Sequence, residues 1–257
     1  MGWDCLFVAA NNMVHTLQFL AAAMPFLSIV IPAWNEEKRL PPALGLLEAF
    51  RRELLWESEV IVVVEQSSDA TLDLANAFAS THPGFEIIGS SLHRGKGHAV
   101  RIGMQRARGD FLFYMDADLS VPLKEIGPFL DYFQAHSEVA ILVGNRAHAA
   151  SRITRRQAWL RRTMGRLFNR ILQKTRLASL HDTQCGFKAF RREAARAIFA
   201  RQKLDGFAFD VEVLLLGERL GYTIADLPVE WLNSPDSKVH IFRDSIRMLR
   251  DLRRMTR

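Results

Sequence analysis

Phe111-Leu112-Phe113-Tyr114-Met115-Asp116-Ala117-Asp118 joins a run of apolar residues directly to two carboxylates. The apolar run is typical of a buried strand, and the carboxylates stand where that strand should end. Two carboxylates one residue apart offer the oxygen ligands that Mg²⁺ or Mn²⁺ prefers. The alternative is that the pair caps a helix beginning near Leu119. Asp116 and Asp118 are therefore candidate metal ligands.

Strand and helix signals alternate on both sides of this stretch. Apolar runs predict strands over residues 26–31, 59–64, 85–89, 111–115 and 139–143, and helical spacing predicts helices over 40–56, 68–80, 96–107 and 123–135. We expect Pro32 to end the first strand, because proline cannot donate a hydrogen bond to a strand ladder. Nearly continuous β-branched runs that alternate with helices predict an α/β fold with a mostly parallel sheet, covered by helices on both faces.

In a sheet of this kind, ligands bind outside the carboxyl ends of the strands. Polar segments at 34–36, 65–67, 93–96 and 116–118 each follow a predicted strand, so we expect them at one edge.

The segment His93-Arg94-Gly95-Lys96-Gly97-His98 places glycines and cations just before a predicted helix. Glycines let the backbone approach a ligand, and a helix start favours negative charge. The segment is not a P-loop, and alone it is more simply a basic surface turn. Beside two carboxylates at the same edge, a nucleotide diphosphate becomes the better explanation, with a cation bridging carboxylates and phosphates.

Composition adds bounds on domain number, partners and compartment. The 257 residues are enough for one large domain, and the formal net charge of +6 points to an anionic partner. Cys5 and Cys185 are far apart, so neither a disulfide framework nor a cysteine metal site is predicted, and a reducing compartment is favoured. The sequence contains no run of about 20 apolar residues, so no membrane span is predicted. Residues 1–24 lack the basic start of a secretory signal, and we expect a weakly ordered or surface-lying leader.

Several motifs occur together and in order. Ile31–Glu37, Val60–Thr71, Arg94–Arg101 and Asp116–Asp118 resemble the motifs of inverting GT-A fold glycosyltransferases of family 2. His181–Lys188 and Gly206–Glu212 are similar to the polyprenyl-phosphate branch of that family, most closely the dolichyl-phosphate β-glucosyltransferases. The resemblance runs from about Phe26 to Arg250. It implies a GT-A domain over residues 25–237, and the pattern of apolar and basic residues predicts a basic amphipathic helix over 238–257.

The resemblance also implies roles for individual residues. Asn35 and Glu36 match the loop that contacts the nucleoside, Lys96 matches the loop near the phosphates, and Asp116 and Asp118 match the metal and diphosphate motif. Asp182 and Gln184 match a loop near the donor sugar and acceptor, and Asp210 and Glu212 match an acidic pair on the acceptor side. Together with the basic segment described below, these matches give the candidate site. The candidate catalytic residues are Asp210, Glu212, Asp182 and Gln184, and the candidate substrate-binding residues are Pro32, Asn35, Glu36, Glu65, Arg94, Lys96, Asp116, Arg152 and Arg155.

The chain departs from the family pattern at one place. Many relatives carry two aspartates after the second strand, one of which contacts the base, whereas this chain has Val64 and Glu65. We therefore expect Glu65 to supply one acidic contact to the base, with uracil and guanine as alternatives.

The chemistry of the implied acceptor bears on the role of Asp210. A phosphate monoester is largely ionised near pH 7, because its second pKa is about 6. Such a nucleophile needs positioning more than it needs a general base. We therefore expect Asp210 and Glu212 to position substrates, whereas a sugar-hydroxyl acceptor would require a carboxylate base.

Two basic segments predict where a lipid phosphate would bind. Residues 152–176 contain Arg152, Arg155 and further cations without any acidic residue, and apolar side chains recur there at helical spacing. Residues 238–257 repeat this pattern. A basic amphipathic helix is typical of a membrane-surface element, although a helix packed on the core is the alternative. No nucleic acid is expected as a partner, because no recognition motif is present.

The sequence thus predicts an enzyme that moves a hexose, glucose from UDP-glucose in the first instance, onto a polyprenyl or dolichyl phosphate with inversion. It would act with Mg²⁺ or Mn²⁺, peripherally on the cytoplasmic face of an anionic membrane surface, and a separate membrane partner that presents the product is compatible with this prediction. The alternatives are a GDP-mannose-dependent polyprenyl-phosphate mannosyltransferase and a non-catalytic membrane- or nucleic-acid-binding module on the same fold.

Overall fold

The structure is a computed structural model that describes residues 26–151, 180 and 182–232. The expected leader, the basic segment 152–176 with Arg152 and Arg155, and the expected C-terminal helix lie outside the described residues. No helix within the described ranges has the length and apolar character needed to cross a membrane.

Strands and helices alternate over residues 27–145 as expected. The strands are β1 (Leu27–Ala33), β2 (Ser58–Val64), β3 (Phe85–Gly89), β4 (Phe111–Tyr114), β5 (Val139–Asn145), β6 (Lys188–Arg191) and β7 (Thr223–Pro228). The helices are α2 (Leu40–Glu53), α3 (Thr71–Ala79), α4 (Lys96–Arg106), α5 (Ile126–Ala135), α7 (Arg192–Phe199) and α8 (Phe209–Arg219), with a 3₁₀ turn, η1 (Leu123–Glu125), before α5.

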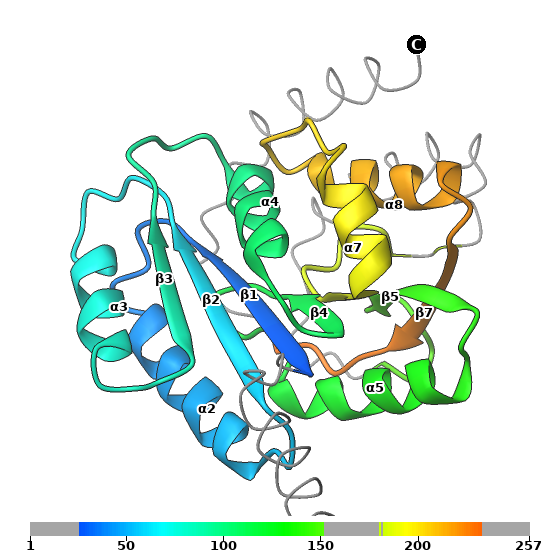
Figure 1. Cartoon of the computed structure of the whole chain (residues 1–257), viewed down its shortest axis with the longest axis horizontal. Helices are drawn as coiled ribbons and strands as arrows, with labels where there is room; N and C mark the ends of the chain where they lie inside the picture. The colour runs from blue at the N-terminus through cyan, green and yellow to red at the C-terminus, as the bar shows by residue number, and fades with distance from the viewer. Residues whose placement is uncertain (1–25, 152–179, 181, 233–257) are drawn as a thin grey trace, which may run out of the picture.

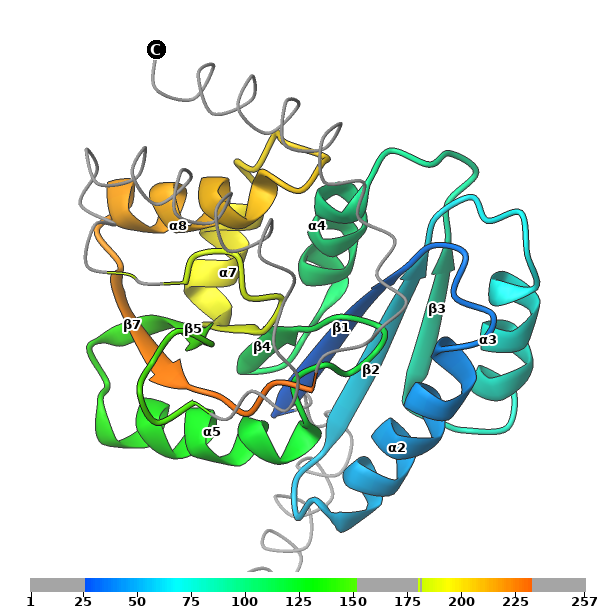
Figure 2. The ribbon, with the colours of Figure 1, turned by 180° about the vertical axis from the view of Figure 1, so that it is seen from behind.

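Within the described residues, the strands form one 7-stranded sheet in the order β3-β2-β1-β4-β6-β5-β7. All neighbouring strands pair in parallel except β6, which is antiparallel to both β4 and β5. The expectation of a mostly parallel sheet is confirmed. Helices α2, α3 and α5 cover one face, and α4, α7 and α8 cover the other (Figures 1 and 2).

The alternation of side chains along each strand builds two separate cores. In β2, Val60, Val62 and Val64 pack with the α2 and α5 side, whereas Ile61 and Val63 pack with the α4 and α8 side. All five are at most 1% exposed. Residues 60–64 of this central strand are buried on both faces, which is why this stretch has no polar alternate position.

Pro32 does not end β1, contrary to the expectation from the sequence, because β1 continues to Ala33. β4 pairs with β1 only as far as Val30, whose carbonyl accepts from the amide of Met115. The backbone nitrogen of Pro32, two residues further along β1, points to the same side as the Val30 carbonyl, but β4 has already ended there. Its missing N–H therefore removes no ladder hydrogen bond.

The parallel pairing places the carboxyl ends of β1, β2 and β3 together, as Figure 1 shows. The loops after these strands and after β4 hold the polar segments at 34–36, 65–67, 93–96 and 116–118. The predicted convergence of these segments at one edge is therefore found in the fold.

Candidate active site

The first residue of α4 and the second residue after β4 form an ion pair. Nζ of Lys96 lies 2.6 Å from Oδ1 of Asp116, and the Lys96 side chain is 17% exposed. Burial acts to lower the pKa of Lys96, but the charges of Asp116, Asp210 and Asp118 outweigh it and raise the pKa above its usual value. One cation thus stands among the three carboxylates that the sequence singled out.

Asp118 is held more firmly than Asp116. Its Oδ1 accepts from the amide of Ser120 at 3.0 Å and from the Ser120 hydroxyl at 2.6 Å. Its Oδ2 lies 3.4 Å from a guanidinium nitrogen of Arg39. The Asp116 side chain, by contrast, is 42% exposed, so it is open to a ligand that approaches from solvent.

Asp116 and Asp118 fit a divalent cation whose remaining coordination positions are filled by a diphosphate. The described residues contain no group of three or more His, Cys, Asp or Glu side chains arranged to hold a metal. Mg²⁺ and its analogues are commonly held by one or two carboxylates, with the remaining positions taken by substrate phosphates and water. The donor set of Asp116 and Asp118 matches that pattern and not that of a site built wholly from protein ligands.

Gly186 makes room for the Asp116 carboxylate. A Cβ atom added at Gly186 would lie only 2.1 Å from Oδ2 of Asp116. Any other residue would therefore displace the carboxylate. The segment that follows Asp182 and the loop after β4 are thus fitted to one another at the candidate metal site.

Asp210, at the start of α8, belongs to a buried polar cluster. Its Oδ1 accepts from the Tyr114 hydroxyl at 2.7 Å and lies 2.5 Å from Nζ of Lys188. Nζ of Lys188 also donates to the carbonyl of Cys185 at 2.6 Å. Burial and the Asp210 charge together raise the pKa of Tyr114 well above its usual value. Because two donors already occupy Oδ1 of Asp210, this oxygen is positioned by the protein.

Glu212 lies two residues further along the same helix and accepts hydrogen bonds from backbone amides. Its two carboxylate oxygens accept from the amides of Lys203 at 3.0 Å and Leu204 at 2.8 Å. The side chain therefore holds the loop before α8, and that loop packs against α4, because a Cβ at Gly97 would lie 2.5 Å from the carbonyl of Leu204.

Asp182 forms a two-pronged ion pair with Arg146, which follows β5. The guanidinium donates to its two oxygens at 2.7 and 2.9 Å, and the amide of Arg146 donates to Oδ2 at 3.0 Å. Burial acts to raise the pKa of Asp182, but the Arg146 charge and hydrogen bonds outweigh it and lower the pKa. Arg146 also lies over the ring of Trp231, 5.7 Å from its centroid. Gln184 lies half-buried in the turn that follows.

The loop after β1 is tied to the loop after β2. Asn35 has a positive φ of 53°, which asparagine tolerates, and its amide donates to the Ser67 hydroxyl at 3.0 Å. Its side-chain oxygen accepts from the amide of Ser68 at 2.8 Å. Glu36 is buried and pairs with Arg39 at 2.5 Å. These contacts hold Asn35 and Glu36 at the edge where the resemblance places a nucleoside.

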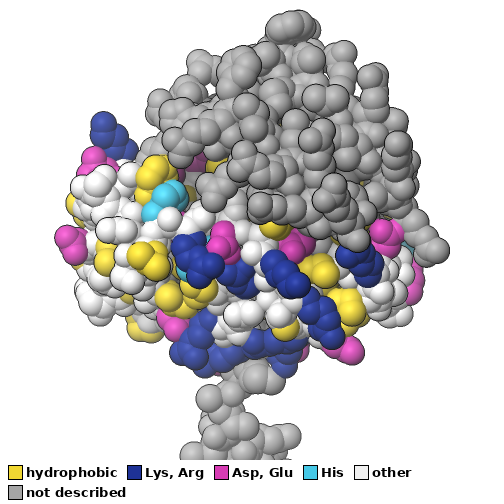
Figure 3. All heavy atoms as spheres, turned by 90° about the horizontal axis from the view of Figure 1, so that it is seen from above, with side chains coloured by type: hydrophobic (Ala, Val, Ile, Leu, Met, Phe, Trp, Pro, Cys, Tyr) yellow, Lys and Arg dark blue, Asp and Glu magenta, His cyan; other side chains and the backbone are white. Residues whose placement is uncertain are grey.

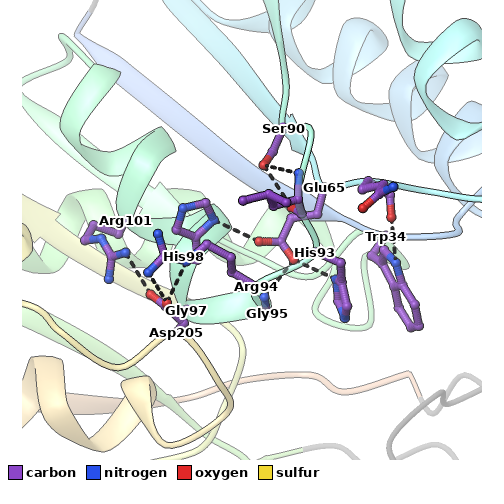
Figure 4. Close-up of polar contacts among 12 residues, drawn as sticks. Trp34, Glu65, Ser90, His93, Arg94, Gly95, Gly97, His98, Arg101 and Asp205 are labelled. Atoms are coloured by element: carbon purple, nitrogen blue, oxygen red, sulfur yellow. Dashed lines mark hydrogen bonds and ion pairs between the residues drawn. The ribbon is translucent and has the colours of Figure 1, made fainter.

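Glu65 lies beneath the loop that precedes α4 (Figure 4). Its carboxylate accepts from the amide of Gly95 at 2.8 Å, and Nδ1 atoms of His93 and His98 lie 2.8 and 2.9 Å from its two oxygens. The ring of His93 stacks on Trp34 with a centroid distance of 4.1 Å.

On the other side of this loop, Arg94 and Arg101 each lie 2.7 Å from a carboxylate oxygen of Asp205. The face of the molecule seen in Figure 3 carries further Lys and Arg side chains among its described atoms.

The structure brings most of the candidate residues to one edge, and it adds four that the sequence did not single out. Lys96, Asp116, Asp118 and Asp210 form one electrostatic group. The added residues are Lys188, Tyr114, Arg146 and Arg39, which pair with Asp210, Asp182 and Asp118. Lys188 lies inside a motif quoted for the resemblance, but no spacing rule in the sequence pairs it with a residue 22 positions later.

Comparison with known proteins places this geometry in a family. The family model described as "Glycosyl transferase family 2" matches residues 28–199. The dolichyl-phosphate beta-glucosyltransferase of Dictyostelium discoideum is 32% identical over 240 residues, covering 90% of this chain and 73% of the relative. The enzymes of the same name from Drosophila melanogaster and Homo sapiens are 35% and 32% identical, with 88% of this chain and 73% of each relative covered.

Solved structures confirm the fold. Glucosyl-3-phosphoglycerate synthase from Mycobacterium tuberculosis, in complex with UDP, superimposes with a TM-score of 0.66 at 18% identity, over 93% of this chain and 82% of that one. A complex of the same enzyme with Mn²⁺, UDP and glucosyl-3-phosphoglycerate gives a TM-score of 0.63 at 19% identity, over 93% and 83% of the two chains. Mannosyl-3-phosphoglycerate synthase from Rubrobacter xylanophilus gives 0.66 at 19% identity, over 91% and 74%. The expected GT-A fold is confirmed.

Proposed function

Because this chain belongs to glycosyltransferase family 2, we propose that it transfers glucose from UDP-glucose to dolichyl phosphate or a related polyprenyl phosphate, with inversion at the sugar. Its relatives named dolichyl-phosphate beta-glucosyltransferase match most of its length at 32–35% identity, which supports this donor sugar and this acceptor. The neighbour structures that contain UDP support uridine as the nucleoside of the donor.

One structural observation supports the proposal most directly. Lys96 and the open carboxylate of Asp116 lie 2.6 Å apart at the carboxyl edge of the sheet. A cation and a metal-ligating carboxylate side by side are what a metal-bound diphosphate requires. Asp116 and Asp118 would hold Mg²⁺ or Mn²⁺ there. When bound, the metal would neutralise charge on the departing diphosphate.

The acceptor supplies its own nucleophile. An oxygen of the lipid phosphate attacks the anomeric carbon, the bond from that carbon to the diphosphate breaks, and its electron pair leaves with UDP. Because the second pKa of a phosphate monoester is about 6, the attacking oxygen is already charged near pH 7. The enzyme must then align two anions that repel one another, which is work for cations and fixed hydrogen-bond donors.

Within this proposal Asp210 positions groups and does not remove a proton. Its Oδ1 accepts hydrogen bonds from Tyr114 and Lys188, which fix the orientation of the Asp210 carboxylate. The charge of this carboxylate acts on Lys96. Asp182, paired with Arg146, has the same role for the segment that contains Gln184 and Gly186. The acceptor is a lipid, so we place the enzyme peripherally on the cytoplasmic face of a membrane.

A donor and acceptor panel tests the function. Purified protein would be incubated with Mn²⁺, a short-chain polyprenyl phosphate and each of UDP-glucose, UDP-galactose, GDP-mannose and GDP-glucose, and products would be identified by mass. We expect glucosylated polyprenyl phosphate from UDP-glucose, no product without metal, and no product from the Asp116→Asn variant. If product formed from GDP-mannose alone, the donor sugar would be mannose and not glucose. If no sugar nucleotide gave either transfer or hydrolysis, an enzymatic role would be contradicted.

A further inference from the structure

Glu65 stands where the family resemblance implies an aspartate, yet its side chain faces inward. The Glu65 side chain is 2% exposed. Its Oε2 lies 2.8 Å from both the amide of Gly95 and Nδ1 of His93, and its Oε1 lies 2.9 Å from Nδ1 of His98. A carboxylate can only accept, so both imidazoles present an N–H to it. Three donors from one six-residue stretch therefore converge on a single side chain (Figure 4).

This arrangement leaves Glu65 without a means to contact a base. A base-contacting carboxylate must offer a free oxygen lone pair at the surface of the pocket, as the acceptor for a ring or exocyclic N–H. Both oxygens of Glu65 are directed at the 93–98 loop, and the side chain has almost no exposed surface. Contact with a base would require breaking buried hydrogen bonds to a charged group, each of which is costly to leave unmade.

The 93–98 loop, which Glu65 binds, has an unusual backbone conformation at Gly95. Gly95 has a φ of 127°, in the region that favours glycine, and a Cβ there would lie 2.6 Å from the carbonyl of Asp205. The amide of Gly95 is the one bound by Glu65, and the next residue is Lys96. The orientation of the Lys96 backbone, and with it the start of α4, is therefore set by a contact one residue away.

The opposite side of the loop is held by Asp205. Its carboxylate pairs with Arg94 and Arg101, and its carbonyl accepts from the amide of His98 at 3.2 Å. The loop is thus fixed between a carboxylate beneath it, from the end of β2, and another beside it, from the segment before α8. Phosphate-binding loops work by presenting preformed donors, because a flexible loop would lose entropy when the anion binds.

We propose that Glu65 is a positioning residue that holds the phosphate-binding loop 93–98 and so sets the affinity for the diphosphate of the donor, and that it does not select the base. The proposal deepens the proposed function and rests on it for the identity of the ligand. It assigns the acidic residue after β2 a different task in this chain from the base contact that the family resemblance implies.

Binding of the diphosphate part alone separates the two roles. Dissociation constants for Mn²⁺-pyrophosphate, UDP and GDP would be measured by calorimetry for the wild type, Glu65→Ala and Glu65→Gln. A positioning role predicts that Glu65→Ala weakens pyrophosphate and both nucleotides together, by about tenfold, the size of a lost charge-assisted hydrogen bond. The ratio of UDP to GDP affinity should not change. Glu65→Gln, which keeps one acceptor oxygen for Gly95, should recover part of the loss.

Matched variants and a second measurement guard against simple misfolding. Ser90→Ala removes the two hydrogen bonds between the Ser90 hydroxyl and the backbone of Leu92, within the same β3–α4 connection, but no contact to Glu65. It should leave pyrophosphate binding within about twofold. Hydrogen exchange of the ligand-free protein should show faster exchange over residues 93–98 in Glu65→Ala and in His93→Ala, and unchanged exchange in β2.

The outcomes are distinct. Normal pyrophosphate binding with an altered UDP to GDP ratio would overturn the proposal in favour of a base contact, and so would unchanged exchange of the loop. A wild type that binds none of the three ligands would contradict the proposed function, while faster exchange in Glu65→Ala would still support the holding role.

Discussion

Nζ of Lys188 on β6 lies 2.5 Å from Oδ1 of Asp210 on α8, and neither side chain is more than 5% exposed. Tyr114 on β4 donates to the same oxygen at 2.7 Å. Two strands and a helix that are distant in sequence are thereby joined by a buried charge beneath the candidate active site. Buried pairs of this kind are costly to break, because the remaining partner is left without compensation.

Replacing Lys188 should destabilise the protein strongly. Lys188→Met leaves Asp210 buried beside an apolar group, and we expect a loss of roughly 3–5 kcal/mol in the free energy of unfolding. Urea denaturation at pH 7 measures it. The double variant Lys188→Met, Asp210→Leu should recover much of that loss, because no lone charge remains. A single variant within about 1 kcal/mol of wild type would show that water or another group compensates Asp210.

The Asp182–Arg146 pair should make stability depend on acid pH. Arg146 lowers the pKa of Asp182 below its usual value in the folded protein. A depressed pKa contributes stability that is fully present above the unfolded pKa of about 3.9 and is lost as pH falls below it. Asp182→Asn should therefore lower stability at pH 7 and flatten the decline below about pH 4. Unfolding free energies measured from pH 7 to pH 3 test this, and equal slopes for both proteins would contradict it.

Gly186→Ala should abolish metal-dependent activity while the fold survives. The added methyl would meet Oδ2 of Asp116 at 2.1 Å and push the carboxylate from its place. Gly45→Ala on α2 is the matched control, because a Cβ there meets nothing within 4 Å. The control should be stabilised by about 0.5–1 kcal/mol, since alanine favours a helix. Mn²⁺ binding followed by electron paramagnetic resonance, together with turnover, distinguishes the two variants.

Lys96 should oppose the binding of metal alone and assist the binding of metal with diphosphate. In the ligand-free protein it pairs with Asp116, so Lys96→Met should strengthen Mn²⁺ binding in the absence of nucleotide, by up to roughly tenfold. The same variant should weaken UDP binding in the presence of Mn²⁺, because the cation that faces the phosphates is gone. Titrations with and without UDP measure both effects. Equal shifts in the same direction would indicate that Lys96 does not exchange between the two anions.

Asp210→Asn should lower kcat without removing the acid limb of the pH–rate profile. If the lipid phosphate is its own nucleophile, that limb follows the phosphate ionisation near about pH 6 in both proteins. A general base at Asp210 would instead make the limb disappear in the variant. Profiles from pH 5 to pH 9 at saturating substrates decide between the two roles.

The sequence was sufficient for the framework of the fold and for the position of the site. The five apolar runs that were predicted as strands are strands, because each is too short for a helix and is bounded by polar or helix-starting residues. The parallel arrangement followed, and with it the gathering of four loops at one edge. Pro32 was misplaced because its tolerance within β1 depends on where β4 ends, which no local pattern records.

Several contacts at the site depend on pairing across long distances in the chain. Glu65 and Gly95 are 30 residues apart, and Lys188 and Asp210 are 22 apart. The antiparallel β6 brings Lys188 beside Tyr114, since its insertion between β4 and β5 reverses the direction of the chain there. A sequence pattern specifies which residues are buried, but the partner of a buried polar group is chosen by the tertiary fold.

Residue types and their order determined an α/β sheet, a pair of acidic side chains after β4 and a cationic glycine loop before α4, because burial periodicity and turn chemistry act over a few neighbouring residues. Only the folded chain decided that Asp116 stands open beside Lys96 while Glu65, Asp182 and Asp210 are engaged by other residues. Whether a carboxylate is exposed or paired depends on which strands and helices pack around it, and that is a property of three dimensions.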